Sequence, residues 1–199
     1  MTAYNTILQF FFRPIQSIQS TNTMAGTDLY YASVPLSKNG LQILKNILTK
    51  ATEHYGPNTP HSDILNATLI EDLRPLVTHV QLCSNISKKS VARMATDLNP
   101  EVWEDNEDTV EKLIERCEKT IAMLDGVAPE QVNGREDERV EMQVGPLKME
   151  MSVREQLFNY AIPFFFFHLQ FVYSILRMKG VPLGVADFLM PYIKPHLVQ

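Results

Sequence analysis

Two histidines and a cysteine are the residues of this sequence whose types and spacing could support chemistry. His79 and Cys83 are four positions apart in an apolar segment, so a helix would present both side chains on one face. His168 lies in the middle of a second apolar segment, and two histidines on neighbouring helices can form a metal site in a helical core.

Three interpretations of these residues remain open from the spacing alone. Cys83 is a buried thiol beside a hydrogen-bonded histidine, or His79 and His168 bind a metal ion with a third ligand, or His79 activates Cys83 as a thiolate nucleophile. The spacing identifies no acid that would orient the histidine, so the nucleophile has the least support.

Four segments with helical periodicity must position these side chains. Apolar residues recur at steps of three and four positions across residues 35–54, 71–95, 109–124 and 153–179. Pro35 is expected in the first turn of the first helix, where its missing N–H costs nothing. Pro163 should kink the fourth helix, which begins with a capping box at Ser152 and Glu155.

A change of period precedes the fourth helix. Residues 139–151 alternate apolar and polar side chains on both sides of Gly145 and Pro146. This alternation predicts a short β-hairpin, which is too small to be a domain of its own and should therefore pack on the helices.

The fourth helix raises the questions of membrane insertion and of self-association. Residues 156–176 carry no charged side chain and could span a bilayer by length, but their polar residues and the amphipathic neighbouring helices favour a buried helix.

Phenylalanines 164–167 cover all sides of one turn, because successive residues are about 100° apart. We expect a homodimer to bury this aromatic surface. The alternative is that the apolar tail, residues 181–195, covers it and leaves a monomer.

Composition excludes several classes of protein. The chain has 199 residues, 45% of them hydrophobic, and a formal net charge of −5, which argues against a nucleic-acid-binding protein. Its two cysteines form no CxxC pair, and its glycines form no phosphate-binding loop.

Residues 1–27 contain no acid and are predicted to be a disordered or targeting tail, and Met24 could be an alternative start. Residues 28–199 are then one domain.

Several stretches resemble an uncharacterised family of the DinB/YfiT-like superfamily. They are DLYYASVPLSKNGLQILKNIL, EDLRPLVTHVQLCSN, IPFFFFHLQFVYSILRMKGVPLG and ADFL, which together extend over about residues 28–190. The resemblance implies an all-α fold, a four-helix bundle with a long crossover between the second and third helices. It also implies a divalent metal, zinc or nickel, bound by three histidines. His79 and His168 match two of these ligands, and Phe164 stands at the third position, where no ligand atom is available.

The sequence therefore predicts a bundle protein that binds a small molecule or a divalent metal in its core, with a degenerate metal site at His79 and His168 and Cys83 as an accessory residue. The alternative is a non-catalytic bundle that works by dimerisation or partner binding. Whether the protein is an enzyme is left open by the sequence. We expect a cytoplasmic homodimer that binds neither nucleic acid nor membrane, or, if residues 1–27 are a targeting segment, an organellar one.

Overall fold

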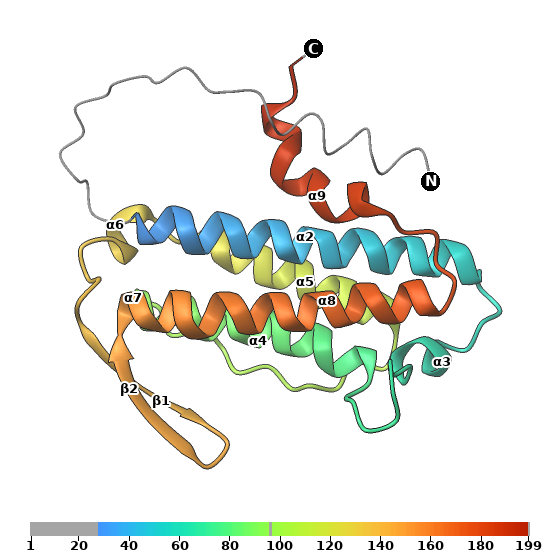
Figure 1. Ribbon diagram of the computed structural model, residues 1–199, viewed down its shortest axis with the longest axis horizontal. Helices are drawn as coiled ribbons and strands as arrows, with labels where there is room; N and C mark the ends of the chain where they lie inside the picture. Colours follow the sequence, from blue (N-terminus) through green and yellow to red (C-terminus); the bar gives the residue numbers. More distant parts are fainter. Residues whose placement is uncertain (1–27, 96, 199) are drawn as a thin grey trace.

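The computed structural model describes residues 28–95 and 97–198, so the predictions for residues 1–27 lie outside the described residues. The described part of the chain is mostly helical, with one small antiparallel hairpin (Figure 1). Its elements, in order, are α2 (Leu29–Tyr55), α3 (His61–Leu65), α4 (Leu76–Met94), α5 (Val110–Asp125), α6 (Pro129–Val132), β1 (Arg139–Val144), β2 (Leu147–Ser152), α7 (Val153–Glu155), a π-helix (Gln156–Ala161), α8 (Ile162–Met178), α9 (Val185–Ile193) and a 3₁₀ turn (Lys194–His196).

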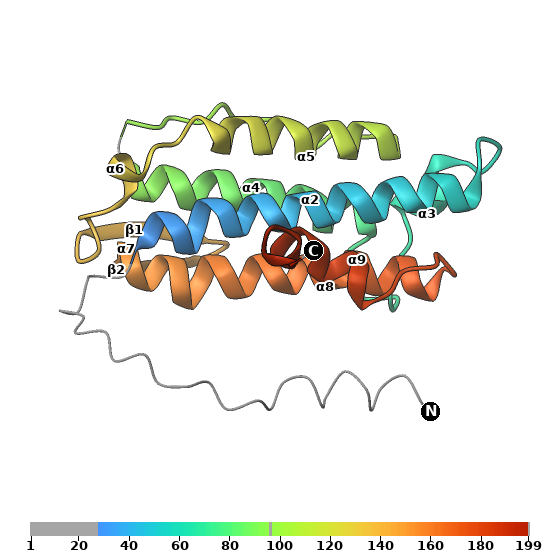
Figure 2. The ribbon, with the colours of Figure 1, turned by 90° about the horizontal axis from the view of Figure 1, so that it is seen from above.

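Four long helical segments lie side by side, because each has an apolar stripe that must be buried. α8 packs against α4 and α2, and α5 packs against α2 and α4 on the other side (Figures 1 and 2). The buried apolar side chains of these segments form one hydrophobic core. α2 and α8 approach so closely at Gly40 that a Cβ atom there would lie 2.3 Å from the ring of Phe165.

The first helix begins earlier than the sequence predicts. Asp28 caps it, accepting a hydrogen bond from the backbone N–H of Tyr31, and Leu29 is buried at the first position. Pro35 is therefore inside α2 and not in its first turn. Pro35 has no N–H to bond to the carbonyl of Tyr31, four residues earlier, but Tyr31 is exposed, so this lost hydrogen bond costs little. The cap and the burial of Leu29 outweigh that cost.

The second helix begins later than the sequence predicts, at Leu76 and not near Glu71. Pro75 is its N-cap. A proline disfavours helical geometry at the residue before it, and that residue, Arg74, stays outside the helix. This late start places the carbonyl of Arg74 beside the first turn of α4, where it contributes to the site described below.

The fourth helical segment changes its winding before Pro163. The capping box has formed as predicted: Ser152 Oγ accepts from the N–H of Glu155, and Glu155 Oε2 accepts from the N–H of Ser152. A π-helix follows, and Pro163 is the second residue of α8. The missing N–H of Pro163 thus falls at the transition between the two windings, where the regular bonding pattern is already interrupted.

Among the residues that the structure describes, one helical stretch, Val153–Met178, is long and apolar enough to span a membrane by length and composition. Core helices of soluble proteins pass the same test, and α8 packs here against both α4 and α2.

The hairpin packs on the helices at its base, as expected, and from there it projects beyond the end of the helical body (Figure 1). Gly145 and Pro146 form its two-residue turn, and Gly145 adopts a φ of 56°, which suits the first position of such a turn. At the base of the hairpin, Val140 packs against the main core.

The tail after α8 covers only part of the aromatic surface. α9 lies beside α2, and Phe188 meets the ring of Tyr173 edge-on at 6.0 Å between centroids (Figure 2). Phe167 remains 53% exposed and Met178 is also exposed. The described residues of the tail thus leave the outer face of α8 open.

Candidate functional site

The structure brings His79 and His168 into direct contact. His79 lies in the first turn of α4 and His168 in the middle of α8, and both side chains are buried at the interface of these helices. Their Nδ1 atoms are 2.8 Å apart, and the Nε2 atom of His79 is 3.1 Å from the carbonyl oxygen of Arg74.

These contacts determine the tautomers of the two rings. A carbonyl oxygen can only accept, so Nε2 of His79 carries a proton and donates it to Arg74. The Nδ1 atom of a neutral His79 must then accept, and His168 donates through its own Nδ1–H. The remaining nitrogen, Nε2 of His168, bears a lone pair. It is buried and has no hydrogen-bond partner among the described residues.

Burial keeps both rings neutral at physiological pH. Burial is the main cause of the lowered pKa of His79. The pKa of His168 is lowered to about 4, first by burial and then by the repulsion that a protonated His79 and Arg74 would exert on a second positive ring. A neutral pair agrees with the hydrogen bond between the rings, because two imidazolium rings would have no acceptor to offer each other.

Three phenylalanines of α8 surround the pair. The rings of Phe164 and Phe167 meet His168 edge-on at 4.5 and 5.2 Å between centroids. Phe171 stacks on His79 at 4.8 Å, with the ring planes 5° apart. Phe167 is the most exposed of the three, so its ring is the least buried part of the aromatic shell around His168.

Cys83 lies one turn after His79 on α4 and takes a different partner. Its Sγ atom is fully buried and donates to the carbonyl oxygen of Phe165 at 3.6 Å. Burial raises the pKa of this thiol well above its usual value. A buried protonated thiol that donates to a carbonyl is a poor nucleophile, so the geometry favours a packing role for Cys83.

The donors do not fit the three-ligand metal centre that the resemblance implies. Both ring nitrogens of His79 are engaged, and Phe164 offers no donor atom. Two nitrogens bound to one tetrahedral zinc ion would lie about 3.4 Å apart, whereas these Nδ1 atoms are at hydrogen-bond distance. In the part of the chain that the structure describes, no group of three His, Cys, Asp or Glu side chains could hold an ion.

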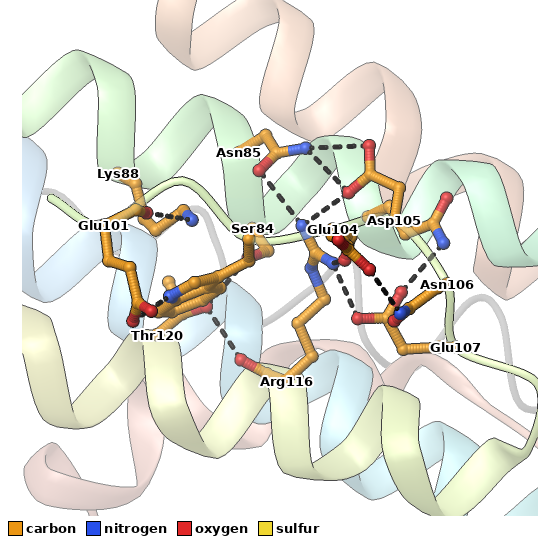
Figure 3. A network of polar contacts seen from close by, with 12 residues as sticks. Ser84, Asn85, Lys88, Glu101, Glu104, Asp105, Asn106, Glu107, Arg116 and Thr120 are labelled. Carbon is orange, nitrogen blue, oxygen red and sulfur yellow. Dashed lines mark hydrogen bonds and ion pairs between the residues drawn. The ribbon is translucent and has the colours of Figure 1, made fainter.

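A second polar cluster holds the connection between α4 and α5 (Figure 3). Arg116, buried on α5, pairs with Asp105 at 2.7 Å and Glu107 at 2.6 Å, and it also donates to the carbonyl oxygen of Glu104 and the amide oxygen of Asn85. The acidic residues 101–108 therefore include an anchor for this connection.

Trp103 occupies the other end of this cluster. The ammonium groups of Lys88 and Lys119 lie 3.4 and 4.3 Å from its ring centroid, and Lys88 also donates to the carbonyl oxygen of Glu101. Burial, followed by the charges of Arg116 and Lys119, lowers the pKa of Lys88 to about 8. The sequence signal for this cluster is the acidic run between helices that carry basic residues.

Comparison with known proteins agrees with the helical arrangement. The chain is similar to a DinB family member protein from Shewanella denitrificans, whose crystal structure superimposes with a TM-score of 0.71 at 26% sequence identity, over 81% of this chain and 91% of that one. No curated protein matches the sequence. The model of the family described as "Domain of unknown function (DUF1993)" matches residues 29–189. The chain therefore belongs to the DUF1993 family.

Proposed function

We propose that this protein is a metal-independent binding protein in which the His79–His168 pair takes the place of a metal centre. The Nε2 lone pair of His168 accepts a hydrogen bond from a small neutral molecule. The observation that carries the proposal is that this nitrogen is buried and unpartnered within the described residues.

The energy of an unpaired acceptor supports this function. Leaving a buried acceptor without a partner costs about 1–3 kcal/mol, and such groups in native proteins call for an explanation. A ligand that donates to Nε2 recovers this free energy. The low pKa of His168 supports the same assignment, because a neutral ring keeps its lone pair available at pH 7.

The surroundings define the chemical class of the ligand. One acceptor, on a ring that Phe164 and Phe167 meet edge-on, suits a compact apolar body with a single O–H or N–H donor. Cationic ligands are disfavoured because Arg74, whose charge contributes to the lowered pKa of both histidines, is itself positive. The half-exposed ring of Phe167 is the part of this aromatic shell that would change its rotamer to admit the ligand.

Phenol is a suitable probe, since it combines an aromatic body with one donor. We expect phenol to shift the ¹⁵N resonance of His168 Nε2 saturably in the natural protein, and His168→Phe to abolish the binding. The control is His196→Phe, the same change at an exposed histidine. Phenol binding that is unchanged in His168→Phe would contradict the proposal. If that variant does not fold, a His168 resonance that phenol leaves unmoved in the natural protein contradicts it equally.

Homodimerisation through α8 is a second candidate function, supported by the exposure of Phe167 and Met178 on this helix. Contiguous exposed apolar surface commonly marks an interface. Light scattering tests it: Phe167→Asp should convert a dimer into a monomer, and a natural protein with the mass of one chain at every concentration would refute it.

We also propose a bundle type for the fold and a cellular location for the protein. We assign the four long helical segments to a DinB/YfiT-like four-helix bundle, with Asn99–Asp108 in its long crossover, and we place the protein in the cytoplasm. Support comes from the DinB family neighbour and from the packing of α8 against α4 and α2.

A further inference from the structure

The projecting hairpin has a chemically regular surface. Its cross-strand pairs alternate strictly: Val140 with Met151, Met142 with Met149 and Val144 with Leu147 lie on one face, while Arg139 with Ser152, Glu141 with Glu150 and Gln143 with Lys148 lie on the other. One face is thus entirely apolar and the other polar. Leu147 is the most exposed apolar side chain of the hairpin, at 63%.

The backbone of β2 has a free edge. The two residues that flank a two-residue turn form a hydrogen-bonded pair, and along the hairpin hydrogen-bonded and non-hydrogen-bonded pairs alternate from there. The hydrogen bond from Val153 N–H to the carbonyl oxygen of Glu138, just beyond the base of the hairpin, fits this alternation. Lys148 and Glu150 therefore direct their N–H and C=O groups away from β1, and the described residues place no further strand there.

This edge is self-complementary in a single register. The sequence Leu147-Lys148-Met149-Glu150-Met151 reads apolar, basic, apolar, acidic, apolar. A two-fold axis through Met149 places Lys148 opposite Glu150 of a second copy, twice, and Leu147 opposite Met151. An axis through Lys148 or Glu150 would instead oppose like charges, which destabilises strand pairing.

The hairpin alone also contains an electrostatic conflict that a second copy relieves. Glu141 and Glu150 lie directly opposite each other, and Arg139, which pairs with Glu150 at 2.9 Å, offsets this repulsion in part. Lys148 of a second copy would stand on the other side of Glu150. Self-pairing of the β1 edge about Val140 would also oppose Arg139 to Glu141, but Arg139 is already paired with Glu150 and this axis lies at the base of the hairpin.

We propose that the free edge of β2 pairs with the same edge of a second copy of this chain, antiparallel about Met149, to form a four-stranded sheet. Two-stranded hairpins are marginally stable by themselves, and a four-stranded sheet is not. Arg139 donates to the outward carbonyl of Glu150 at 3.1 Å, and this exposed side chain gives way when the second strand docks.

Charge-reversal variants test whether two copies pair through β2. Sedimentation equilibrium at micromolar concentrations should show a dimer of the natural chain. Glu150→Lys and Lys148→Glu should each weaken it at least about ten-fold, because each places like charges opposite one another. An equimolar mixture of the two variants should form a heterodimer, since every facing pair then has opposite charges. Glu104→Lys, an exposed charge reversal on the α4–α5 connection, is the control and should leave the dimer intact.

The outcomes separate this interface from the aromatic face of α8. Single variants that remain dimeric, or a mixture that remains monomeric, overturn pairing through β2. A natural chain that is monomeric throughout the concentration range overturns it as well. Dimers that respond to Phe167→Asp and not to Glu150→Lys would locate self-association on α8.

Discussion

Replacing Arg116 by methionine should be among the most destabilising single changes in this protein. Its side chain is 2% exposed and joins α5 to the α4–α5 connection through Asp105 and Glu107. Methionine keeps much of the apolar stem and removes the charge, so the change isolates the electrostatic contribution.

The size of the effect follows from the burial of the partners. Removing one partner of a buried ion pair costs about 3–5 kcal/mol, because the other charge is left uncompensated. Glu107 is 11% exposed and falls in this class, whereas Asp105 is 49% exposed and is screened by water. We therefore expect the lower end, about 3 kcal/mol, which corresponds to a decrease in Tm of roughly 6–12 °C for a domain of this size.

Chemical denaturation of Arg116→Met beside Lys119→Met measures this cost. Lys119 pairs with Glu101 and lies over the Trp103 ring, but its side chain is exposed, so its loss should cost much less than the loss of Arg116. Equal losses in the two variants would refute the argument that Arg116 anchors the connection.

Three further predictions concern the core. Phe164→His should create a zinc site with at least about ten-fold tighter binding than the natural chain, because it adds a donor one turn before His168; isothermal titration that shows equal affinity would count against the assignment of that position. The free energy of unfolding should fall as pH drops from about 6.5 to 4, since the unfolded chain binds a proton at His168 that the folded chain does not. His168→Phe should flatten this part of the profile by up to about 3 kcal/mol, and profiles that coincide would rule out a neutral buried ring. Gly40→Ala should destabilise by about 1–3 kcal/mol through its clash with Phe165, and Phe165→Leu in the same chain should recover part of the loss in thermal melts; an unchanged Tm in the single variant would contradict the close packing of α2 and α8.

Local signals in the sequence were sufficient for part of the fold. The Ser152–Glu155 capping box depends on four consecutive residues, and the period-two alternation on both sides of Gly145 and Pro146 specifies the hairpin register. Both were predicted because nothing distant competes with them.

Features that depend on distant contacts were missed or only partly predicted. Pro35 was expected in a first turn, but the Asp28 cap and buried Leu29 extend the helix before it. The role of Arg116 depends on a connection that folds back over α4 and α5, and no periodicity within α5 reveals it. His79 and His168 were expected to share a site, yet the hydrogen bond between them depends on the Arg74 carbonyl, whose position follows from the late start of α4 at Pro75.

The tautomer of His168 is the most direct test of the central claim, which is that a hydrogen-bonded histidine pair with one free acceptor stands where a metal would be bound. Long-range ¹H–¹⁵N correlation spectra of the ¹⁵N-histidine-labelled chain, purified without a histidine tag, report which ring nitrogens carry protons. We predict that at pH 7 His79 is protonated at Nε2 only and His168 at Nδ1 only. A His168 ring protonated at Nε2, or nitrogen shifts typical of metal coordination at either histidine, would contradict it.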